Sequence, residues 1–319
     1  MQSSLVYGPV PSRRLGRSLG VNNIPPKVCT YACVYCQLGG SNAAAPRRSP
    51  FYRPADIAEA AAERLAEARE RGEAADYVTL VPDGEPTLDV NLGQVIAALT
   101  DLGSPVAVIS NASLIWQPEV REALCQADWV SLKADAADEP TWQRVNRPHA
   151  DLQLERVQEG MLAFRRQFRG TLATETMLVS GVNDAEAQVQ DVAAFLEELE
   201  PDISYISIPT RPPALGWVNA APEESLHYAY QAFTERGLRT ELLIGYEGDA
   251  FAASGDAEAD LLSVTAVHPM REEAVAELLR RDGAGWEVLE GLIRERKLVG
   301  LDYGGHRFYM RRLPGRREP

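Results

Sequence analysis

The chain has 319 residues, of which 45% are hydrophobic and 24% are charged, and its formal net charge is −14 at pH 7. This composition excludes an intrinsically disordered chain, and the acidic balance excludes a protein that grips nucleic acid over its whole surface. No apolar run approaches the roughly 20 residues that span a bilayer, and the N-terminal residues show no signal-like pattern, so we expect a cytoplasmic protein without membrane contact.

The first predicted strand, Leu19–Ile24, follows a stretch rich in proline and glycine that predicts no regular element. This stretch contains Arg13, Arg14 and Arg17. We expect these arginines either to bind an anionic group of a substrate or to pair with carboxylates of the acidic domain. Short β-rich runs then alternate with amphipathic runs as far as Tyr246 and predict six more strands: Tyr77–Val81, Val106–Ser110, Trp129–Lys133, Leu172–Val179, Tyr205–Ile208 and Thr240–Gly245.

The helices between these strands have readable ends. Ala55–Arg71 begins after Pro54 and stops at Gly72, with its apolar residues on one face, and Asn91–Leu102 stops at Gly103 in the same way. Further helices are predicted over Pro118–Ala127 and from a cap at Asn183 and Asp184 to about Glu200.

This alternation predicts an α/β fold in which about six βα units form a partial (β/α)6 barrel, with functional residues at the carboxyl ends of the strands. After Ala253 the pattern changes to a linker, Ser-Gly-Asp-Ala-Glu, followed by two helices and a hairpin. We therefore predict a barrel domain over residues 1–254 and a small winged-helix-like domain over residues 255–319. The elements of the second domain are Arg271–Arg281, Trp286–Glu295, Leu298–Asp302 and Arg307–Arg311.

Three of the four cysteines, Cys29, Cys33 and Cys36, form a C-x₃-C-x₂-C pattern on one short segment. Three thiolates can bind three irons of a [4Fe–4S] cubane and leave the fourth iron free to chelate another molecule. A structural zinc site would require a fourth ligand. The remaining thiol, Cys125, lies in a predicted helix, and we interpret it as a buried small hydrophobic residue.

This spacing, with the aromatic residue Tyr35 directly before the last cysteine, resembles the radical S-adenosylmethionine (SAM) superfamily. The resemblance implies that Cys29, Cys33 and Cys36 are metal ligands and catalytic residues, and that Tyr35 lies at the cofactor. It also implies that the open iron binds the methionine moiety of SAM, and that an electron from the cluster releases a 5′-deoxyadenosyl radical. A low-potential reductant such as flavodoxin or ferredoxin is then expected as a partner.

Two polar segments at predicted strand ends extend this resemblance. The turn Gly84-Glu85-Pro86 resembles the superfamily's Gly-Gly-Glu motif, with Asp83 in place of the first glycine, and is expected to contact the ammonium group of the bound cofactor through its carboxylate. Ser110 and Asn111 resemble the superfamily's ribose motif and are expected to donate hydrogen bonds to, or accept them from, ribose hydroxyls.

Two further strand ends carry candidate site residues. Lys133 resembles the lysine of an Asp-Leu-Lys signature in glycyl-radical activating enzymes, with Ser131 in place of the aspartate, and is expected to meet the methionine carboxylate. Thr210 and Arg211, after the strand Tyr205–Ile208, are expected to close the site or bind the substrate.

A closer resemblance, over most of the catalytic region, is to the branch of tRNA wyosine-base (4-demethylwyosine) synthases and related Fe–S oxidoreductases. The synthases of this branch use a second cysteine-ligated cluster and a lysine that binds pyruvate. No cysteine precedes Cys29 in this chain, so a second cluster is not expected, and the resemblance does not extend to the wyosine reaction. The resemblance is carried by the cluster loop and by Tyr7–Gly20, Ser131–Asp135, Val145–Pro148 and Pro209–Pro213.

We therefore expect an enzyme that uses a 5′-deoxyadenosyl radical to take a hydrogen atom from an RNA nucleoside or from a peptide or protein rather than from a small metabolite, because the C-terminal domain can present a macromolecule. From Val288 to Pro319 eight Lys or Arg stand against four Asp or Glu, which leaves a polyanion partner open. The alternatives are a glycyl-radical-enzyme activase and an Fe–S winged-helix regulator that places Trp286–Glu295 in a DNA groove.

Overall fold

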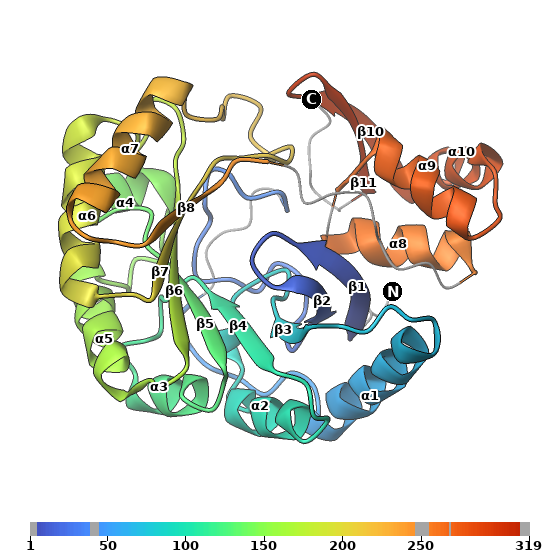
Figure 1. Ribbon diagram of the computed structural model, residues 1–319, viewed down its shortest axis with the longest axis horizontal. Coiled ribbons are helices and arrows are strands. Elements are labelled where there is room, and N and C mark those ends of the chain that lie inside the picture. The colour runs from blue at the N-terminus through green and yellow to red at the C-terminus, as the bar shows by residue number, and fades with distance from the viewer. Residues whose placement is uncertain (1–4, 39–44, 246–254, 268, 313–319) are drawn as a thin grey trace.

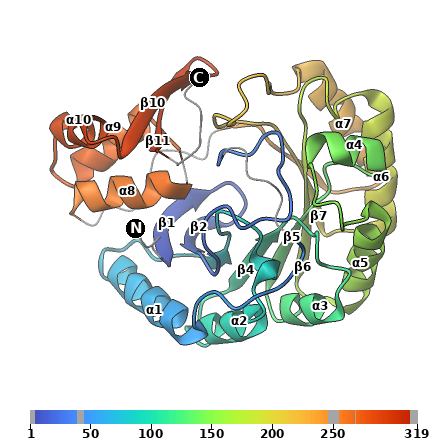
Figure 2. The same ribbon diagram turned by 180° about the vertical axis from the view of Figure 1, so that it is seen from behind.

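The computed structural model describes residues 5–38, 45–245, 255–267 and 269–312. Within these residues the main sheet has eight strands in the order β1 to β8, and it curls so that helices cover its outer side (Figures 1 and 2). β1 pairs antiparallel with β2, and every later pair is parallel. The predicted α/β class with a partial barrel is therefore confirmed.

The strands and helices that were predicted agree with the structure within a few residues, and the structure adds elements that were not predicted. The strands are β1 Val6–Ser12, β2 Gly16–Val21, β3 Tyr77–Leu80, β4 Val106–Ser110, β5 Trp129–Lys133, β6 Thr171–Met177, β7 Ile203–Ser207 and β8 Thr240–Leu243. The helices are α1 Pro54–Glu70, η1 Pro86–Leu88, α2 Leu92–Thr100, α3 Pro118–Leu124, α4 Glu139–Val145, α5 Leu154–Gln167, α6 Glu186–Leu199 and α7 Glu223–Glu235. No helix among the described residues is long and apolar enough to cross a bilayer.

The proline- and glycine-rich segment before the cluster loop is a β-hairpin, so the prediction of no regular element there is wrong. Glycine at position 20 is required for packing between the two strands. A Cβ on Gly20 would lie 2.1 Å from the ring of Tyr7 on the neighbouring strand. At the turn of the hairpin, Leu15 packs with Trp129 and Tyr205 on the inner side of the sheet. The hairpin therefore completes the sheet and fills the base of the half-barrel.

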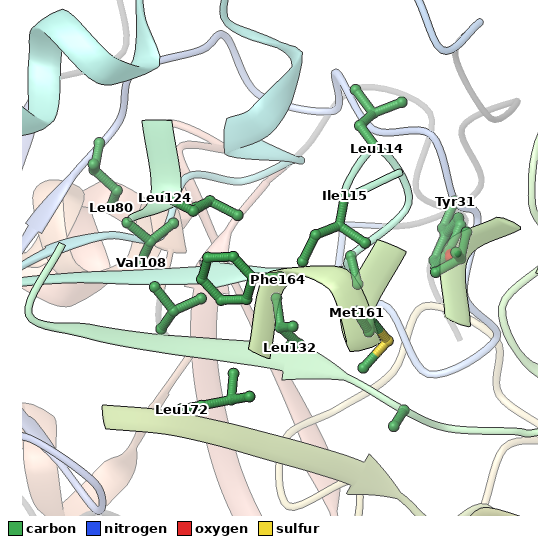
Figure 3. Packing of buried hydrophobic residues seen from close by; sticks show 14 of the residues in the cluster. Tyr31, Leu80, Val108, Leu114, Ile115, Leu124, Leu132, Met161, Phe164 and Leu172 are labelled. Carbon is green, nitrogen blue, oxygen red and sulfur yellow. The ribbon is translucent and has the colours of Figure 1, made fainter. Parts of the chain in front are cut away.

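The outer core fixes the strands relative to one another. Phe164 of α5 is fully buried and lies against a row of side chains from four neighbouring strands (Figure 3). The side chains of this row are Leu80, Val108, Leu132 and Leu172. Because these parallel strands are buried on both sides, their carboxyl ends form a rigid edge on which site residues can be placed.

The start of α6 corrects a predicted cap. Ala185 is the N-cap, and Asn183 and Asp184 stabilise the preceding turn instead. Asn183 donates to the backbone oxygen of Asp135 at 2.8 Å, and Asp184 accepts from the backbone nitrogen of Gly181 at 2.8 Å. Asn183 therefore holds the end of the β5 segment in place, which a helix cap would not do.

The C-terminal unit contains three helices and a three-stranded antiparallel sheet in the order β10-β11-β9. The two predicted helices and the hairpin are present, but Ala257 and Glu258 belong to a helix rather than to the predicted linker, because Leu261 and Val264 of that helix enter the core of the unit. The winged-helix assignment and the boundary after residue 254, which lies outside the described residues, stay predictions. The elements are α8 Ala257–Val267, β9 Met270–Arg271, α9 Glu272–Arg281, α10 Trp286–Arg294, β10 Leu298–Tyr303 and β11 His306–Arg311.

The C-terminal unit packs against β1, which is otherwise the free edge of the main sheet (Figures 1 and 2). Tyr7 and Val10 share one hydrophobic cluster with residues of α8 and α9. Arg64 of α1 donates to the backbone oxygen of Gly8 at 2.6 Å and lies 3.6 Å from Asp260 of α8. Covering an edge strand in this way protects it from pairing with other chains.

Candidate functional site

The cysteine loop is fastened directly to the turn that follows β3. The backbone nitrogen of Lys27 donates to the backbone oxygen of Asp83 at 2.6 Å, and that of Glu85 donates to the oxygen of Val28 at 2.9 Å. A Cβ on Gly84 would lie 2.2 Å from this Val28 oxygen, so only glycine permits the close approach. The predicted Gly-Glu-Pro turn therefore supports the cluster loop through its backbone.

Glu85 is completely buried, and its carboxylate joins two of the predicted site segments, its own turn and Ser110-Asn111. Oε1 accepts from the Ser110 hydroxyl at 2.7 Å and from the Thr87 hydroxyl at 2.6 Å, and Oε2 accepts from the backbone nitrogen of Asn111 at 2.7 Å. Burial raises the pKa of Glu85, although these donors act in the opposite direction. The carboxylate is thus engaged within the chain, and the ammonium and ribose contacts expected of Glu85, Ser110 and Asn111 stay predictions.

Cys29, Cys33 and Cys36 lie together and are each partly buried. Burial raises the pKa of Cys29 well above its usual range and that of Cys33 to about 12, and the neighbouring thiols add to both shifts. Thiolates in such a place need a cationic partner, which bound iron supplies. Three thiolates on one loop can each bind a different iron of a cubane. The donor set therefore fits a cluster.

Two asparagine side chains donate to these sulfurs. Asn111 Nδ2 lies 3.5 Å from Cys29 Sγ, and Asn146 Nδ2 lies 3.4 Å from Cys33 Sγ. Sequence reasoning assigned no role to Asn146. The sequence feature that could have identified Asn146 as a site residue is its position in the segment Val145–Pro148, which carried part of the family resemblance.

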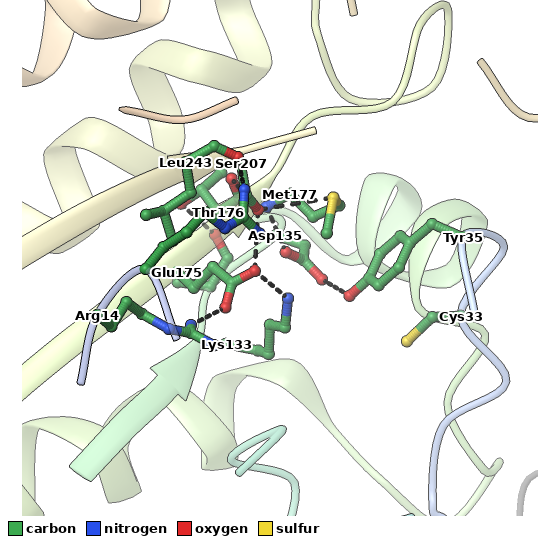
Figure 4. Close-up of polar contacts among 12 residues, drawn as sticks. Arg14, Cys33, Tyr35, Lys133, Asp135, Glu175, Thr176, Met177, Ser207 and Leu243 are labelled. Atoms are coloured by element: carbon green, nitrogen blue, oxygen red, sulfur yellow. Dashed lines mark hydrogen bonds and ion pairs between the residues drawn. The ribbon is translucent and has the colours of Figure 1, made fainter. Parts of the chain in front are cut away.

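Tyr35 is anchored by Asp135, which follows the end of β5. The Tyr35 hydroxyl donates to Asp135 Oδ2, which also accepts from Asn146 Nδ2 at 2.7 Å, and Oδ1 accepts from the backbone nitrogen of Met177 at 2.8 Å (Figure 4). Asp135 is only 3% exposed and joins the cluster loop to β5 and β6. Sequence reasoning missed this role, although Asp135 stands two residues after Lys133 at the same strand end.

Glu175 of β6 is buried and binds two partly buried cations inside the half-barrel. Lys133 Nζ lies 2.8 Å from Oε1, and Arg14 of the hairpin turn pairs with Oε2 (Figure 4). Burial alone would raise the pKa of Glu175, but Lys133 and Arg14 outweigh it and hold that pKa well below its usual range. Burial likewise acts to lower the pKa of Lys133, and Glu175 and Asp135 raise it overall. Arg14 was expected either to bind an anionic group of a substrate or to pair with a carboxylate. Among the described residues it pairs with the carboxylate of Glu175.

Arg13 connects the hairpin to the opposite edge of the sheet. Its guanidinium donates to the backbone oxygens of Leu243 and Gly245, the latter at 2.8 Å. β1 and β8 are the two edges of an open sheet, so this contact and the Arg14–Glu175 pair hold the hairpin turn across the interior of the half-barrel. Neither arginine is thereby shown to bind substrate.

A pocket of about 190 Å³ lies between the hairpin and the ends of β3 and β4. Arg211 and Asp83 both line this pocket. Thr210 lies between Arg211 and Pro209. The backbone oxygen of Pro209 accepts a hydrogen bond from the Tyr303 hydroxyl of β10 at 2.8 Å. The C-terminal hairpin therefore touches the segment that contributes Arg211 to the pocket. The other lining residues are Tyr7, Val10, Pro11, Ser12, Arg13, Arg14, Leu15, Ser18, Thr79, Val81, Pro82 and Ile109.

The Asp83 carboxyl is expected to make stability depend on pH. Burial raises its pKa from 3.8 to about 7, so the folded chain holds the proton more tightly than the unfolded chain, and stability falls as the pH rises from about 4 to about 7. Asp83→Asn should therefore increase the free energy of unfolding at pH 8 by about 2 kcal/mol, half of the full linkage value because the pocket admits water. Urea unfolding at pH 4, 6 and 8 measures this.

The control for this prediction is the exposed residue Asp101, which ends α2. Asp101→Asn, a surface substitution, should change the free energy of unfolding at pH 8 by less than about 0.5 kcal/mol. A constant difference between Asp83→Asn and the wild type from pH 4 to pH 8 would show that Asp83 carries no such penalty.

Comparisons with known proteins agree with this geometry. Residues 23–193, just over half of the chain, match the model of the Radical SAM superfamily. The UPF0026 protein MJ1312 of Methanocaldococcus jannaschii is 41% identical over 315 residues, which cover 98% of each chain. A UPF0026 protein of Helicobacter pylori is 33% identical over 217 residues, 65% of this chain and 67% of that protein.

Solved structures show the same fold at low sequence identity. TYW1 with a lysine–pyruvate adduct bound is 14% identical, with a TM-score of 0.55 over 70% of this chain and 75% of that one. SuiB of Streptococcus suis bound to S-adenosylmethionine is 13% identical, with a TM-score of 0.52 over 70% of this chain. This chain covers only 49% of the SuiB chain, so SuiB contains a large part without a counterpart here.

Proposed function

The chain belongs to the radical SAM superfamily, and from this premise we propose that it takes a hydrogen atom from a macromolecular substrate, an RNA nucleoside or a peptide. Membership brings the superfamily's two cofactors, a [4Fe–4S] cluster and S-adenosylmethionine. When bound, the cluster supplies the electron that splits S-adenosylmethionine to methionine and a 5′-deoxyadenosyl radical. The residues of this chain hold the two cofactors and position them relative to the substrate.

The observation that carries the proposal is the placement of the cysteine loop against the carboxyl ends of the strands. The loop is fixed by the Glu85 backbone on one side and by the Tyr35–Asp135 hydrogen bond on the other. Cys29, Cys33 and Cys36 are the proposed ligands. Two fixed points allow the loop to keep one geometry while substrate and cofactor enter and leave.

Lys133 is proposed to attract the carboxylate of the bound methionine moiety. Glu175 and Asp135 keep its amine protonated despite burial, and its Nζ lies 5.2 Å from the ring centroid of Tyr35 in the cluster loop. A protonated amine attracts an anion but is a poor nucleophile, so this lysine is not expected to form a covalent adduct with pyruvate such as that in the TYW1 structure.

The preference for a macromolecular substrate rests on the C-terminal unit. Through Tyr303 this unit touches Pro209, two residues before Arg211 of the pocket, so a chain that docks on the unit lies near the site. One structure that shares the fold, SuiB, has been solved with its precursor peptide SuiA. An external low-potential reductant, a flavodoxin or a ferredoxin, is proposed to deliver the electron.

The test is the formation of 5′-deoxyadenosine by the anaerobically reconstituted chain with S-adenosylmethionine and dithionite. We expect slow formation without substrate, and a faster rate when size-fractionated cell RNA or a peptide digest contains the substrate. A protein that holds a cluster but forms no 5′-deoxyadenosine would instead be an Fe–S regulator. A rate that rises only with a glycyl-radical enzyme would identify an activase.

A further inference from the structure

Two of the cluster thiols receive hydrogen bonds from asparagine amides whose orientation is fixed. Asn111 Nδ2 donates to Cys29 Sγ and to the Thr30 hydroxyl, while Asn111 Oδ1 accepts from the backbone nitrogen of Ser113 at 2.9 Å. An amide oxygen cannot donate to sulfur, and the Ser113 contact fixes which end of the amide is the oxygen. Both hydrogens of this amide are therefore used, one of them on a cluster ligand.

The second amide repeats this arrangement on another thiol. Asn146 Nδ2 lies 3.4 Å from Cys33 Sγ and 2.7 Å from Asp135 Oδ2, and a carboxylate oxygen can only accept, so the nitrogen must face both atoms. Asn146 is 2% exposed, and Asp135 is 3% exposed. A buried carboxylate also holds the first asparagine, because Glu85 accepts from the backbone nitrogen of Asn111.

We propose that Asn111 and Asn146 are positioning residues that set the reduction potential of the cluster by donating to Cys29 and Cys33, an inference that rests on the proposed function. One-electron reduction adds a negative charge that spreads over the sulfurs, so amide donors stabilise the reduced cluster more than the oxidised one. The electron comes from the external reductant. Asn146 is buried and Asn111 is partly buried, so water replaces a lost donor poorly, and loss of either amide lowers the potential and makes reduction more difficult.

The experiment measures the midpoint potential of the reconstituted cluster by EPR-monitored titration with dithionite, together with its iron and sulfide content. Asn111→Ala and Asn146→Ala should each lower the equilibrium constant for reduction about tenfold, which is 59 mV for one electron. The control is Asn23→Ala. Asn23 is buried, as Asn146 is, and donates to Asp89 and to the Pro86 oxygen rather than to a thiol, and its removal should leave the potential unchanged.

A second measurement does not depend on the stability of any variant. Wild-type protein labelled with ¹⁵N-asparagine should show hyperfine coupling of amide nitrogen to the reduced cluster in pulsed EPR. Unchanged potentials in both variants with full iron content, or the absence of this coupling in the wild type, would overturn the inference while leaving the proposed function standing. A wild-type protein that assembles no reducible four-iron cluster would overturn both.

Discussion

Replacing Cys33 with alanine should abolish cluster assembly and reduce 5′-deoxyadenosine formation to the level measured without protein. Two thiolates hold only two of the four irons, and Cys125 cannot substitute, because it ends α3 and the charged groups that act on it, Arg121, Arg169 and Glu122, are not in the site. Iron content, the visible absorbance of the reconstituted protein and 5′-deoxyadenosine yield measure the loss. Cys29→Ala and Cys36→Ala should give the same result.

Cys125→Ala is the matched control, and it should retain iron and activity within about twofold of the wild type. Cys125 packs against the main core, but it is partly buried rather than buried as the sequence predicted, so its loss should change stability by less than about 1 kcal/mol. Retention of iron by Cys33→Ala, or its loss in Cys125→Ala, would contradict the assignment of the ligands.

Replacing Glu175 with glutamine should lower the free energy of unfolding of the cluster-free protein by about 3–5 kcal/mol at pH 7, because Arg14 and Lys133, both largely shielded from water, lose the carboxylate that pairs with them. The three side chains are between 8% and 18% exposed, so water replaces the lost partner poorly. The matched control is Glu197→Gln. Its partner is Arg236 on the surface, and such exposed pairs contribute at most about 1 kcal/mol.

This difference should depend on pH in a defined direction. The pKa of Glu175 in the folded chain is depressed from its ordinary value of 4.5, so the folded state binds the proton less tightly than the unfolded state. The stability it contributes is complete above about pH 4.5 and is lost as the pH falls further. Guanidinium unfolding at pH 7 and pH 3 measures this. A gap between wild type and Glu175→Gln that widens toward pH 3 would show that the sign is wrong.

The barrel was predictable because its signals are local. The β-rich runs and the helix ends at Gly72 and Gly103 can be read within a window of about 15 residues, and the cysteine spacing occupies eight. The β1–β2 hairpin was missed because the glycines and prolines that ordinarily mark a loop here allow Tyr7 to pack on Gly20. That requirement is visible only after the two strands have paired.

The site was only partly predictable, for a different reason. Glu85 was assigned separately from the pair Ser110 and Asn111, and the structure brings the three residues together on one buried carboxylate. Glu175 was not identified at all, since its partners lie 42 and 161 residues away. The available signal was a single charged residue within the buried strand Thr171–Met177. A charge in such a place requires a partner, but the sequence does not say which residue supplies it.

The shared core of β1 and the C-terminal unit has a consequence for synthesis on the ribosome. Tyr7 and Val10 leave the exit tunnel some 250 residues before the side chains of α8 and α9 that cover them. For most of translation the nascent chain therefore presents an uncovered apolar edge. A protein cut after the barrel would keep that edge permanently, so the barrel expressed alone should associate through β1.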